Sequence, residues 1–332
     1  MKKLLLLLLL CLAVAGCGIS RTHKISNTGF AMDTFVRVDA YAPNENTGKE
    51  RVNKALFIFR RTAGCADRYT DGGKGSIYEV NNSLQPVKAD PLLQEMFRRL
   101  QGCSSSHLDL SMGPVIDVWS EHRRSRTVPA PVELQRALIH TGEGKYIFDS
   151  EAGTLRRSEA GVSLDLGSVA KGFAVDKAAE VLQNGNIDGA LINAGGNIRV
   201  IGVKPDHTPW TIAIQHPRRE NETIGSIELK PGQAAATSGD YQRYYEVQGV
   251  RYHHLLSTET GQPVRRFQSV TVIAPTALEA DYNSTLLFLM DWDSIRSYLD
   301  SHHELDAVFV DSSGRITVTS GLERQFPDAA VL

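Results

Sequence analysis

The chain has 332 residues, of which 42% are hydrophobic and 22% are charged, and its formal net charge is −2. These proportions are ordinary for a globular protein. A chain that binds nucleic acid usually carries an excess of basic residues, so the charge argues against a nucleic-acid partner. The sequence contains no Cys-x-x-Cys pair and no His-rich metal motif.

The first 17 residues have the layout of an exported bacterial lipoprotein. Lys2 and Lys3 precede an unbroken run of leucines, and Val14-Ala15-Gly16-Cys17 matches a lipobox. A secretory signal has this order of basic, apolar and small residues, and the apolar run is shorter than the roughly 20 residues of a membrane span. We therefore predict a signal peptide at residues 1–16 and a lipid on Cys17. The predicted location is the bacterial cell envelope, on the periplasmic face of a membrane. The alternatives are a plain signal peptide with a chance cysteine and a core helix.

Residues 17–28 are predicted to hold the lipidated cysteine and a polar tether, because the segment lacks hydrophobic periodicity. The folded domain is then expected to cover residues 29–332. Cys65 and Cys103 are the two cysteines that remain after the signal peptide and lipid site are set aside. Export permits a disulfide between them, but two cysteines alone do not decide whether they pair.

The folded part is predicted to mix helices with strands, according to the period of its apolar residues. The expected strands cover residues 30–41, 163–166, 190–193, 198–203, 210–215, 226–229, 307–310 and 315–319. The expected helices cover residues 46–62, 90–100, 170–182 and 280–290, with a loop at 71–75 and a surface excursion around Pro129 and Pro131. This mixture favours an α+β fold over a regular doubly wound sheet.

The stretch from Asp165 to Lys171 joins a predicted strand to a helix through small residues. The start of a helix presents unpaired amides and a positive dipole end, which suit a phosphate group, and Lys171 adds a positive charge. The stretch is neither a Walker loop nor a Rossmann fingerprint. An ordinary strand-to-helix turn explains the local pattern equally well. The Gly195-Gly196 turn after the next strand permits close approach of a ligand, but such turns are common.

Asp281 and Thr285 lie four residues apart near the start of an apolar helix, so they share one helix face. A carboxylate and a hydroxyl on one face suit a hard ion such as Mg²⁺. The alternative is that Asp281 is simply a helix cap.

His253 and His254 follow a stretch of small, hydroxylated and charged residues at 236–244. Such residues can position a phosphate or a proton transfer. Neighbouring residues of a strand face opposite sides, so the two imidazoles are not expected to bind one metal together. A structural role for either histidine remains open at this point.

Eight stretches, taken together and in order, resemble the ApbE family of flavin transferases over nearly all of the mature chain. They are AMDT at 31–34, SIYEVN at 76–81, DLSMGPVIDVW at 109–119, LDLGSVAKGFAVD at 164–176, INAGGNI at 192–198, TSGDY at 237–241, HHLL at 253–256 with TGQP at 260–263, and AD at 280–281 with ST at 284–285. The resemblance implies a single compact α+β domain of the ApbE type.

The same resemblance implies a reaction. The enzyme would use Mg²⁺ to cleave FAD as its substrate, join FMN to a threonine hydroxyl of an exported acceptor protein, and release AMP. The residues that would hold the metal are Ser168, through a carbonyl of its turn, Asp281 and Thr285. The residues that would bind the flavin nucleotide are Met32, Tyr69, Ser111, Met112, Gly113, Asp165, Lys171 and Leu255. Tyr78 is the alternative candidate for the role given to Tyr69. His254 would transfer a proton or position the acceptor threonine.

The sequence departs from the family pattern at two places. Ser257-Thr258 stands where an Asp-Pro pair usually follows the histidines, which leaves open how His254 is oriented. Tyr282-Asn283 replaces a usual Ala-Leu pair but leaves Asp281 and Thr285 intact. Two alternatives remain: an FAD pyrophosphatase that uses water as the acceptor, and a non-catalytic flavin-binding lipoprotein.

Overall fold

The computed structural model describes residues 22–103 and 105–332. The predicted signal peptide and the predicted lipid site at Cys17 lie outside the described residues. In the part of the chain that the structure describes, no helix is both long and apolar enough to cross a bilayer.

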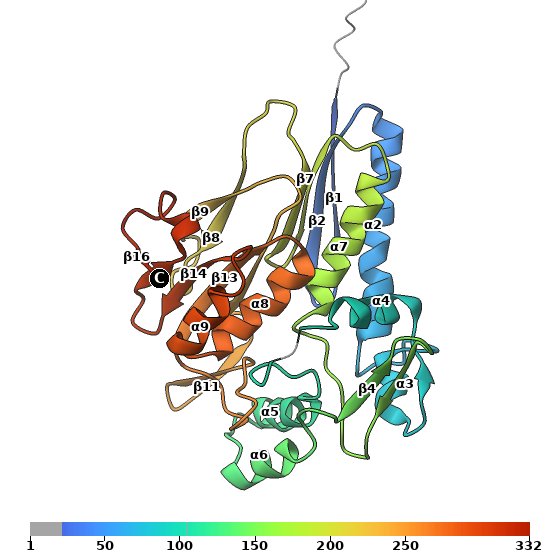
Figure 1. Ribbon diagram of the computed structural model, residues 1–332, viewed down its shortest axis with the longest axis vertical. Helices are drawn as coiled ribbons and strands as arrows, with labels where there is room; N and C mark the ends of the chain where they lie inside the picture. The colour runs from blue at the N-terminus through green and yellow to red at the C-terminus, as the bar shows by residue number, and fades with distance from the viewer. Residues whose placement is uncertain (1–21, 104) are drawn as a thin grey trace, which may run out of the picture.

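A nine-stranded sheet runs through the molecule in the order β1-β2-β6-β7-β10-β13-β14-β15-β16 (Figure 1). Every neighbouring pair is antiparallel except β15 and β16. The strands are β1 (His23–Ala31), β2 (Thr34–Ala42), β6 (Gly189–Ala194), β7 (Asn197–Gly202), β10 (Ala234–Gly239), β13 (Phe267–Ala274), β14 (Asp306–Asp311), β15 (Ile316–Val318) and β16 (Ala330–Val331). Antiparallel pairing combined with packed helices makes this an α+β fold, as predicted.

Both faces of the sheet are covered. One face packs against α2 (Glu45–Ala66), α7 (Ala170–Gln183), α8 (Ala277–Leu289) and α9 (Trp292–Leu299), and their apolar residues form the larger core. The other face packs against the hairpin of β8 (Trp210–Gln215) and β9 (Thr223–Leu229). Alternate residues of β8 are buried, as expected of a strand with one face on a core.

The remaining elements lie together beyond one end of the large sheet and form separate small sheets and helices there (Figure 1). A third apolar cluster joins helices α5 and α6 to the small hairpin of β11 and β12. These elements are α3 (Ile77–Asn82), β3 (Val87–Lys88), α4 (Pro91–Arg99), α5 (Gly113–Ser125), α6 (Pro131–Leu138), β4 (Tyr146–Asp149), β5 (Thr154–Arg157), β11 (Tyr244–Val247) and β12 (Val250–His253).

The helices predicted from periodicity are confirmed. Residues 46–62, 90–100, 170–182 and 280–290 correspond to α2, α4, α7 and α8 within a few residues at their ends. Asp90 caps α4 by accepting from Leu92 N, and Pro91 stands at the first helical position, where its missing N–H costs nothing. The hairpin predicted near the C-terminus is confirmed as β14 and β15.

Several local predictions are wrong. The tether predicted up to residue 28 ends earlier, because β1 begins at His23 and pairs along its length with β2. The strand predicted at 30–41 is a hairpin that turns at Met32 and Asp33, which have φ values of 53° and 57°. The surface excursion around Pro131 is helix α6, whose Leu134 is buried.

The strand predicted at 163–166 is also wrong, since only Ser163 makes an isolated bridge, to Met112. Leu164 N instead donates to the Asn81 side chain, and Asp165 N donates to Leu110 O. The backbone N–H groups of Leu164 and Asp165 thus find their hydrogen-bond partners in loops rather than in a neighbouring strand. Cys65 and Cys103 are both free, with Cys65 buried and Cys103 exposed.

Candidate functional site

Ten of the predicted site residues line one cavity of about 640 Å³. The cavity lies where α7 and α8 meet the β1–β2 turn, α5 and the segment after β12. The ten are Met32, Tyr69, Met112, Asp165, Ser168, Lys171, His254, Leu255, Asp281 and Thr285. Segments that are far apart in the sequence therefore contribute to one concave site, which is typical of a ligand-binding pocket.

Two predicted residues do not line the cavity, and a third lies outside the described residues. Ser111 is fully buried, and its hydroxyl donates to Asp109. Gly113 N donates to Ser163 O, and a Cβ on Gly113 would stand 2.4 Å from that oxygen. These two residues hold the turn that presents Met112, rather than contacting the cavity themselves. Cys17 is the predicted site residue that the structure does not describe.

Asp281 projects from the inner wall of the cavity and is 5% exposed. The N-cap of α8 is Thr276, whose side chain accepts from Glu279 N, so the helix-cap explanation for Asp281 is wrong. Asp281 Oδ2 accepts from Gly172 N at 2.9 Å, and Oδ1 lies 3.7 Å from Lys171 Nζ. Burial raises the pKa of Asp281 above its ordinary value of 3.8, while the Lys171 charge and the Gly172 amide oppose that rise.

The Lys171 ammonium lies near two oxygen atoms of this wall. Lys171 Nζ donates to Gly167 O at 3.2 Å as well as facing Asp281. Thr285 Oγ1 lies 3.2 Å from Asp281 O and 3.1 Å from Ser238 Oγ. The Lys171 ammonium therefore already lies beside oxygen atoms that are predicted to bind the metal.

The donor set of this wall fits a hard cation. It offers one carboxylate, one hydroxyl and the carbonyl of Gly167, next to Ser168. Asn197 also borders the cavity, and its Oδ1 is buried without a hydrogen-bond partner among the described residues. No group of three His, Cys, Asp or Glu side chains suited to a metal occurs in the described part of the chain. Mg²⁺ does not need such a group, since it commonly keeps waters and substrate phosphates beside one or two carboxylates.

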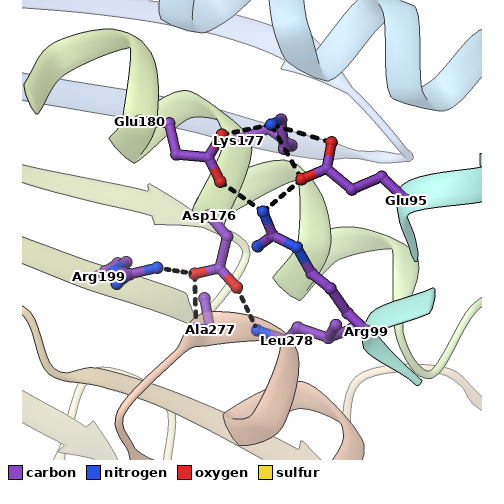
Figure 2. A network of polar contacts seen from close by, with 8 residues as sticks. All are labelled: Glu95, Arg99, Asp176, Lys177, Glu180, Arg199, Ala277 and Leu278. Carbon is purple, nitrogen blue, oxygen red and sulfur yellow. Dashed lines mark hydrogen bonds and ion pairs between the residues drawn. The ribbon is translucent and has the colours of Figure 1, made fainter. Parts of the chain in front are cut away.

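Asp176 fixes α8 against α7, one turn beyond Gly172 (Figure 2). It is fully buried, accepts from Ala277 N at 2.8 Å and Leu278 N at 3.0 Å, and pairs with Arg199. The helices meet so closely that a Cβ on Gly172 would stand 2.2 Å from Ala277 O. The start of α8, and hence the position of Asp281 one turn later, is set by this contact. Sequence reasoning gave Asp176 no role, although an acidic residue among the apolar residues 173–179 is a signal of a buried partner.

A second set of ion pairs surrounds this contact on the outside (Figure 2). Glu180 of α7 pairs with Lys177 and Arg99, and Glu95 of α4 pairs with the same two cations. These four side chains are between 18% and 37% exposed. They join α4 to α7 where water partly screens the charges.

His254 faces the cavity directly after β12, whereas His253 is buried against the edge of Phe288. The two histidines therefore have different environments, as predicted. His254 Nδ1 lies 3.2 Å from Arg243 O. A carbonyl only accepts, so Nδ1 carries the hydrogen and Nε2 is left free to accept a proton. The surrounding protein atoms, followed by the Arg243 charge, lower the pKa of His254 below 6.5, so the imidazole is neutral at pH 7.

With Ser257-Thr258 at this position, no carboxylate of the described residues pairs with His254. Ser257 Oγ accepts from Glu259 N and Thr260 N, and Thr258 Oγ1 donates to Ser106 O at 2.7 Å. Both hydroxyls thus stabilise the loop. The Arg243 carbonyl orients the imidazole instead.

Aromatic and thioether groups border the remainder of the cavity. Met32 lies at the β1–β2 turn, and Tyr69 is 62% exposed with the Arg68 guanidinium 4.8 Å from its ring centroid. Tyr78 does not border the cavity, so the structure favours Tyr69 of the two candidates. Asp165 Oδ1 accepts from Gly167 N at 2.8 Å and thereby holds the turn that starts α7.

A model of the ApbE family matches residues 32–309. Similar proteins include the FAD:protein FMN transferases of Vibrio cholerae, 36% identical over 73% of this chain and 70% of that protein, and of Haemophilus influenzae, 30% identical over 88% and 89%. Among solved structures, the ApbE protein of Thermotoga maritima is 29% identical, with a TM-score of 0.82 over 91% of this chain and 99% of that one. The flavin transferase ApbE from Vibrio cholerae, 24% identical with a TM-score of 0.78 over 92% of this chain and 100% of that chain, shares the fold.

Proposed function

The chain belongs to the ApbE family, and from this membership we propose that it transfers FMN from FAD to a threonine hydroxyl of an exported partner protein, with Mg²⁺. It is a transferase, as its curated relatives are. The observation that carries the proposal is the meeting of Asp281, Thr285, Lys171 and His254 around one cavity.

The proposed reaction replaces the phosphoanhydride bond of FAD with a phosphoester bond to the acceptor threonine. The threonine oxygen bonds to the phosphorus on the FMN side of the diphosphate, and the bond from that phosphorus to the bridging oxygen breaks. The electron pair leaves with AMP, and the hydroxyl proton passes to Nε2 of the neutral His254 imidazole. Cleaving FAD this way joins FMN to the acceptor and releases no free FMN.

The cavity residues serve this reaction in distinct ways. Asp281, Thr285 and the carbonyl of the Gly167-Ser168 turn would hold Mg²⁺, which when bound neutralises charge on the diphosphate. Lys171 adds a positive charge at the start of α7, beside amides suited to phosphate. Met32, Tyr69, Met112 and Leu255 supply the apolar and aromatic contacts that suit ring systems.

The test uses the full-length chain in detergent with FAD, Mg²⁺ and an exported domain that carries a flavin-acceptor threonine. We expect an adduct that survives denaturation, fluoresces in a gel and adds the mass of one FMN less one water. The adduct should be lost when the acceptor threonine becomes valine. Equal AMP release with and without acceptor, with no adduct, would identify an FAD pyrophosphatase. FAD that binds and stays whole would identify a flavin-binding protein.

We also propose that Cys17 carries a lipid that anchors the protein to the periplasmic face of a membrane. The support is the lipobox in the sequence. Two or more acyl chains anchor a protein stably, because each buried CH₂ contributes about 0.8 kcal/mol. Cys17→Ser should move the protein from the membrane fraction to the soluble periplasm. A wild-type protein found soluble there would contradict the anchor.

A further inference from the structure

Two large aromatic side chains project into solvent from the β1–β2 hairpin. Phe30 and Phe35 are directly paired across the hairpin and are 63% and 71% exposed. Directly opposed residues of antiparallel strands project from the same face. Their ring centroids are 5.5 Å apart, in an edge-to-face arrangement. Exposed aromatic residues gathered in this way are characteristic of protein interfaces.

The aromatic pair lies beside the mouth of the cavity. The turn that joins the two strands, residues 32–34, borders the cavity, and Phe35 directly follows it. Phe30 and Phe35 themselves do not border the cavity in the described part of the chain, so a ligand inside it leaves them uncovered. A molecule that covers the two phenylalanine rings must extend out of the cavity and over the hairpin.

The mouth also carries arginines. Arg123 of α5 and Arg243 before β11 border the cavity, and neither lies within 4.0 Å of a carboxylate in the described residues. Arg123 further borders a second hollow of about 370 Å³ that Arg126 and Tyr244 share. The C-terminal end of a helix attracts cations, which accounts for Arg123 and Arg126, but Arg243 lies on no helix. Positive charge thus extends outward from the cavity in a protein whose net charge is −2.

We propose that Phe30, Phe35, Arg123 and Arg243 form a docking surface for the acceptor protein, whose acidic residues lie near the threonine that receives FMN. This inference rests on the proposed function, because it concerns the second substrate of the same site. Complementary charge supports an acidic partner, since unpaired arginines at a mouth attract carboxylates and steer their approach. Aromatic residues and arginine are also the types most enriched where partners bind.

A membrane fits this surface less well than a protein does. The chain enters the domain at His23, and seven strand residues at about 3.3 Å each place Phe30 roughly 23 Å from that end. The segment that carries the predicted lipid therefore attaches at the end of β1 opposite the aromatic pair (Figure 1). The point where the proposed anchor joins the domain and the aromatic pair thus lie at opposite ends of one strand, which favours a protein over the membrane as the partner of this surface.

The experiment compares Phe35→Ser with Phe57→Ser, and Arg123→Glu with Arg124→Glu. Phe57 is 53% exposed on α2, Arg124 neighbours Arg123 on α5, and neither borders a cavity described above. Full-length protein is assayed for the KM of the acceptor, for FAD affinity by flavin fluorescence, and for the midpoint of unfolding. We expect Phe35→Ser to raise the acceptor KM about tenfold and Arg123→Glu about fivefold or more, with FAD affinity unchanged. Salt should weaken the wild type more than Arg123→Glu.

The outcomes separate the docking surface from its rivals. An acceptor KM that stays constant while the wild type forms the adduct would overturn the docking proposal and leave the proposed function intact. A loss of FAD affinity that matches the rise in KM would assign the residues to the nucleotide instead. Binding to anionic vesicles that both surface variants abolish would assign the surface to a membrane. If the wild type forms no adduct with any acceptor, the proposed function fails and the docking proposal with it.

Discussion

The inner wall of the cavity, with Lys171, Asp281 and Thr285, differs from its mouth, with Arg123 and Arg243, in how the polar side chains are paired. Asp281 on the inner wall and Asp176 behind it are both buried, and backbone amides from two helices hold them. At the mouth, Phe35 and Arg123 are exposed, and Arg123 has no carboxylate partner among the described residues. The wall is thus fixed before any ligand arrives, whereas the mouth keeps its contacts for a partner.

This difference separates chemistry from recognition. Groups that stabilise charge work best when they are already oriented, because no reorganisation is then needed during the reaction. Groups that recognise a protein partner must stay accessible until the partner docks. Substitutions on the wall should therefore affect catalysis or folding strongly, and those at the mouth should affect the acceptor KM.

The largest effect is expected for Asp281→Ala. The change removes the only carboxylate of the predicted Mg²⁺ site, so metal-dependent cleavage of FAD should fall by about 10³-fold. AMP release measured by chromatography over a range of Mg²⁺ concentrations checks this. Thr285→Val, which removes a neutral oxygen, should cost less than Asp281→Ala.

Asp293→Ala is the matched control, since that carboxylate is 99% exposed on α9 and its removal should leave the rate unchanged. Wild-type cleavage by Asp281→Ala would show that the metal binds elsewhere and that the buried carboxylate serves only to hold Gly172.

The second effect concerns folding. Asp176→Ala leaves Arg199 without its partner and the first amides of α8 without an acceptor, so the free energy of unfolding should fall by about 3–5 kcal/mol. Denaturant unfolding measures it. Glu180→Ala removes a half-exposed member of the neighbouring ion pairs and should cost less than about 1 kcal/mol. Equal losses in the two variants would contradict the distinction between the buried contact and the outer pairs.

The residues of the inner wall were also easier to predict from the sequence than the contacts that hold them in place. Helical spacing identified α7 and α8, because such a signal lies within a few residues, and the resemblance to the ApbE family placed Asp165, Lys171, Asp281 and Thr285 in one site. The partners of Asp176 lie 23, 101 and 102 residues away, and no local pattern records such distances. Only the fold reveals that contact.

Strands at the edges of the structure were harder to predict. In β1 only Ile25 is buried, so the strand shows no alternation of apolar residues and has the composition of a polar tether. Helix α6 is two turns long, begins at a proline and buries only Leu134 and Ala137, which is too little to show a helical period. Tertiary pairing rather than local propensity forms these elements.

The third effect concerns His254. His254→Ala should slow FMN transfer by about 10²-fold, the usual contribution of general base catalysis, and should change FAD affinity far less. The lowered pKa keeps the imidazole neutral, so the wild-type rate should stay level as the pH falls from 8 to 6. Adduct formation at a series of pH values measures this, with the exposed His303→Ala as the control. A rate that falls about tenfold per pH unit below 7 would show that the group titrates normally.

The smallest effect has the opposite sign and concerns stability without metal. In the folded protein the pKa of Asp281 is raised by burial, so its contribution to stability is fully present below about 3.8 and is lost as the pH rises through the folded pKa. At pH 7 the metal-free wild type has therefore lost this contribution, and the ionisable carboxyl of Asp281 makes folding less favourable than a neutral side chain would. Asp281→Asn keeps an acceptor for Gly172 N but removes that ionisable carboxyl. Its unfolding midpoint should be higher than that of the metal-free wild type by about a few degrees, as is common when a functional charge is removed.

Mg²⁺ should reverse this order. An ion that binds only the folded state stabilises it by about 2.7 kcal/mol at 100 times its dissociation constant, and the asparagine variant lacks the carboxylate needed to bind it. Thermal unfolding of both proteins at pH 5 and pH 7, with EDTA and with excess Mg²⁺, measures this. The variant should be the more stable protein in EDTA, and the wild type should be the more stable protein with Mg²⁺. A variant less stable than the wild type in EDTA would mean that the Asp281 carboxylate supports the fold, like Asp176, and the contrast between a catalytic and a structural carboxylate on this wall would be lost.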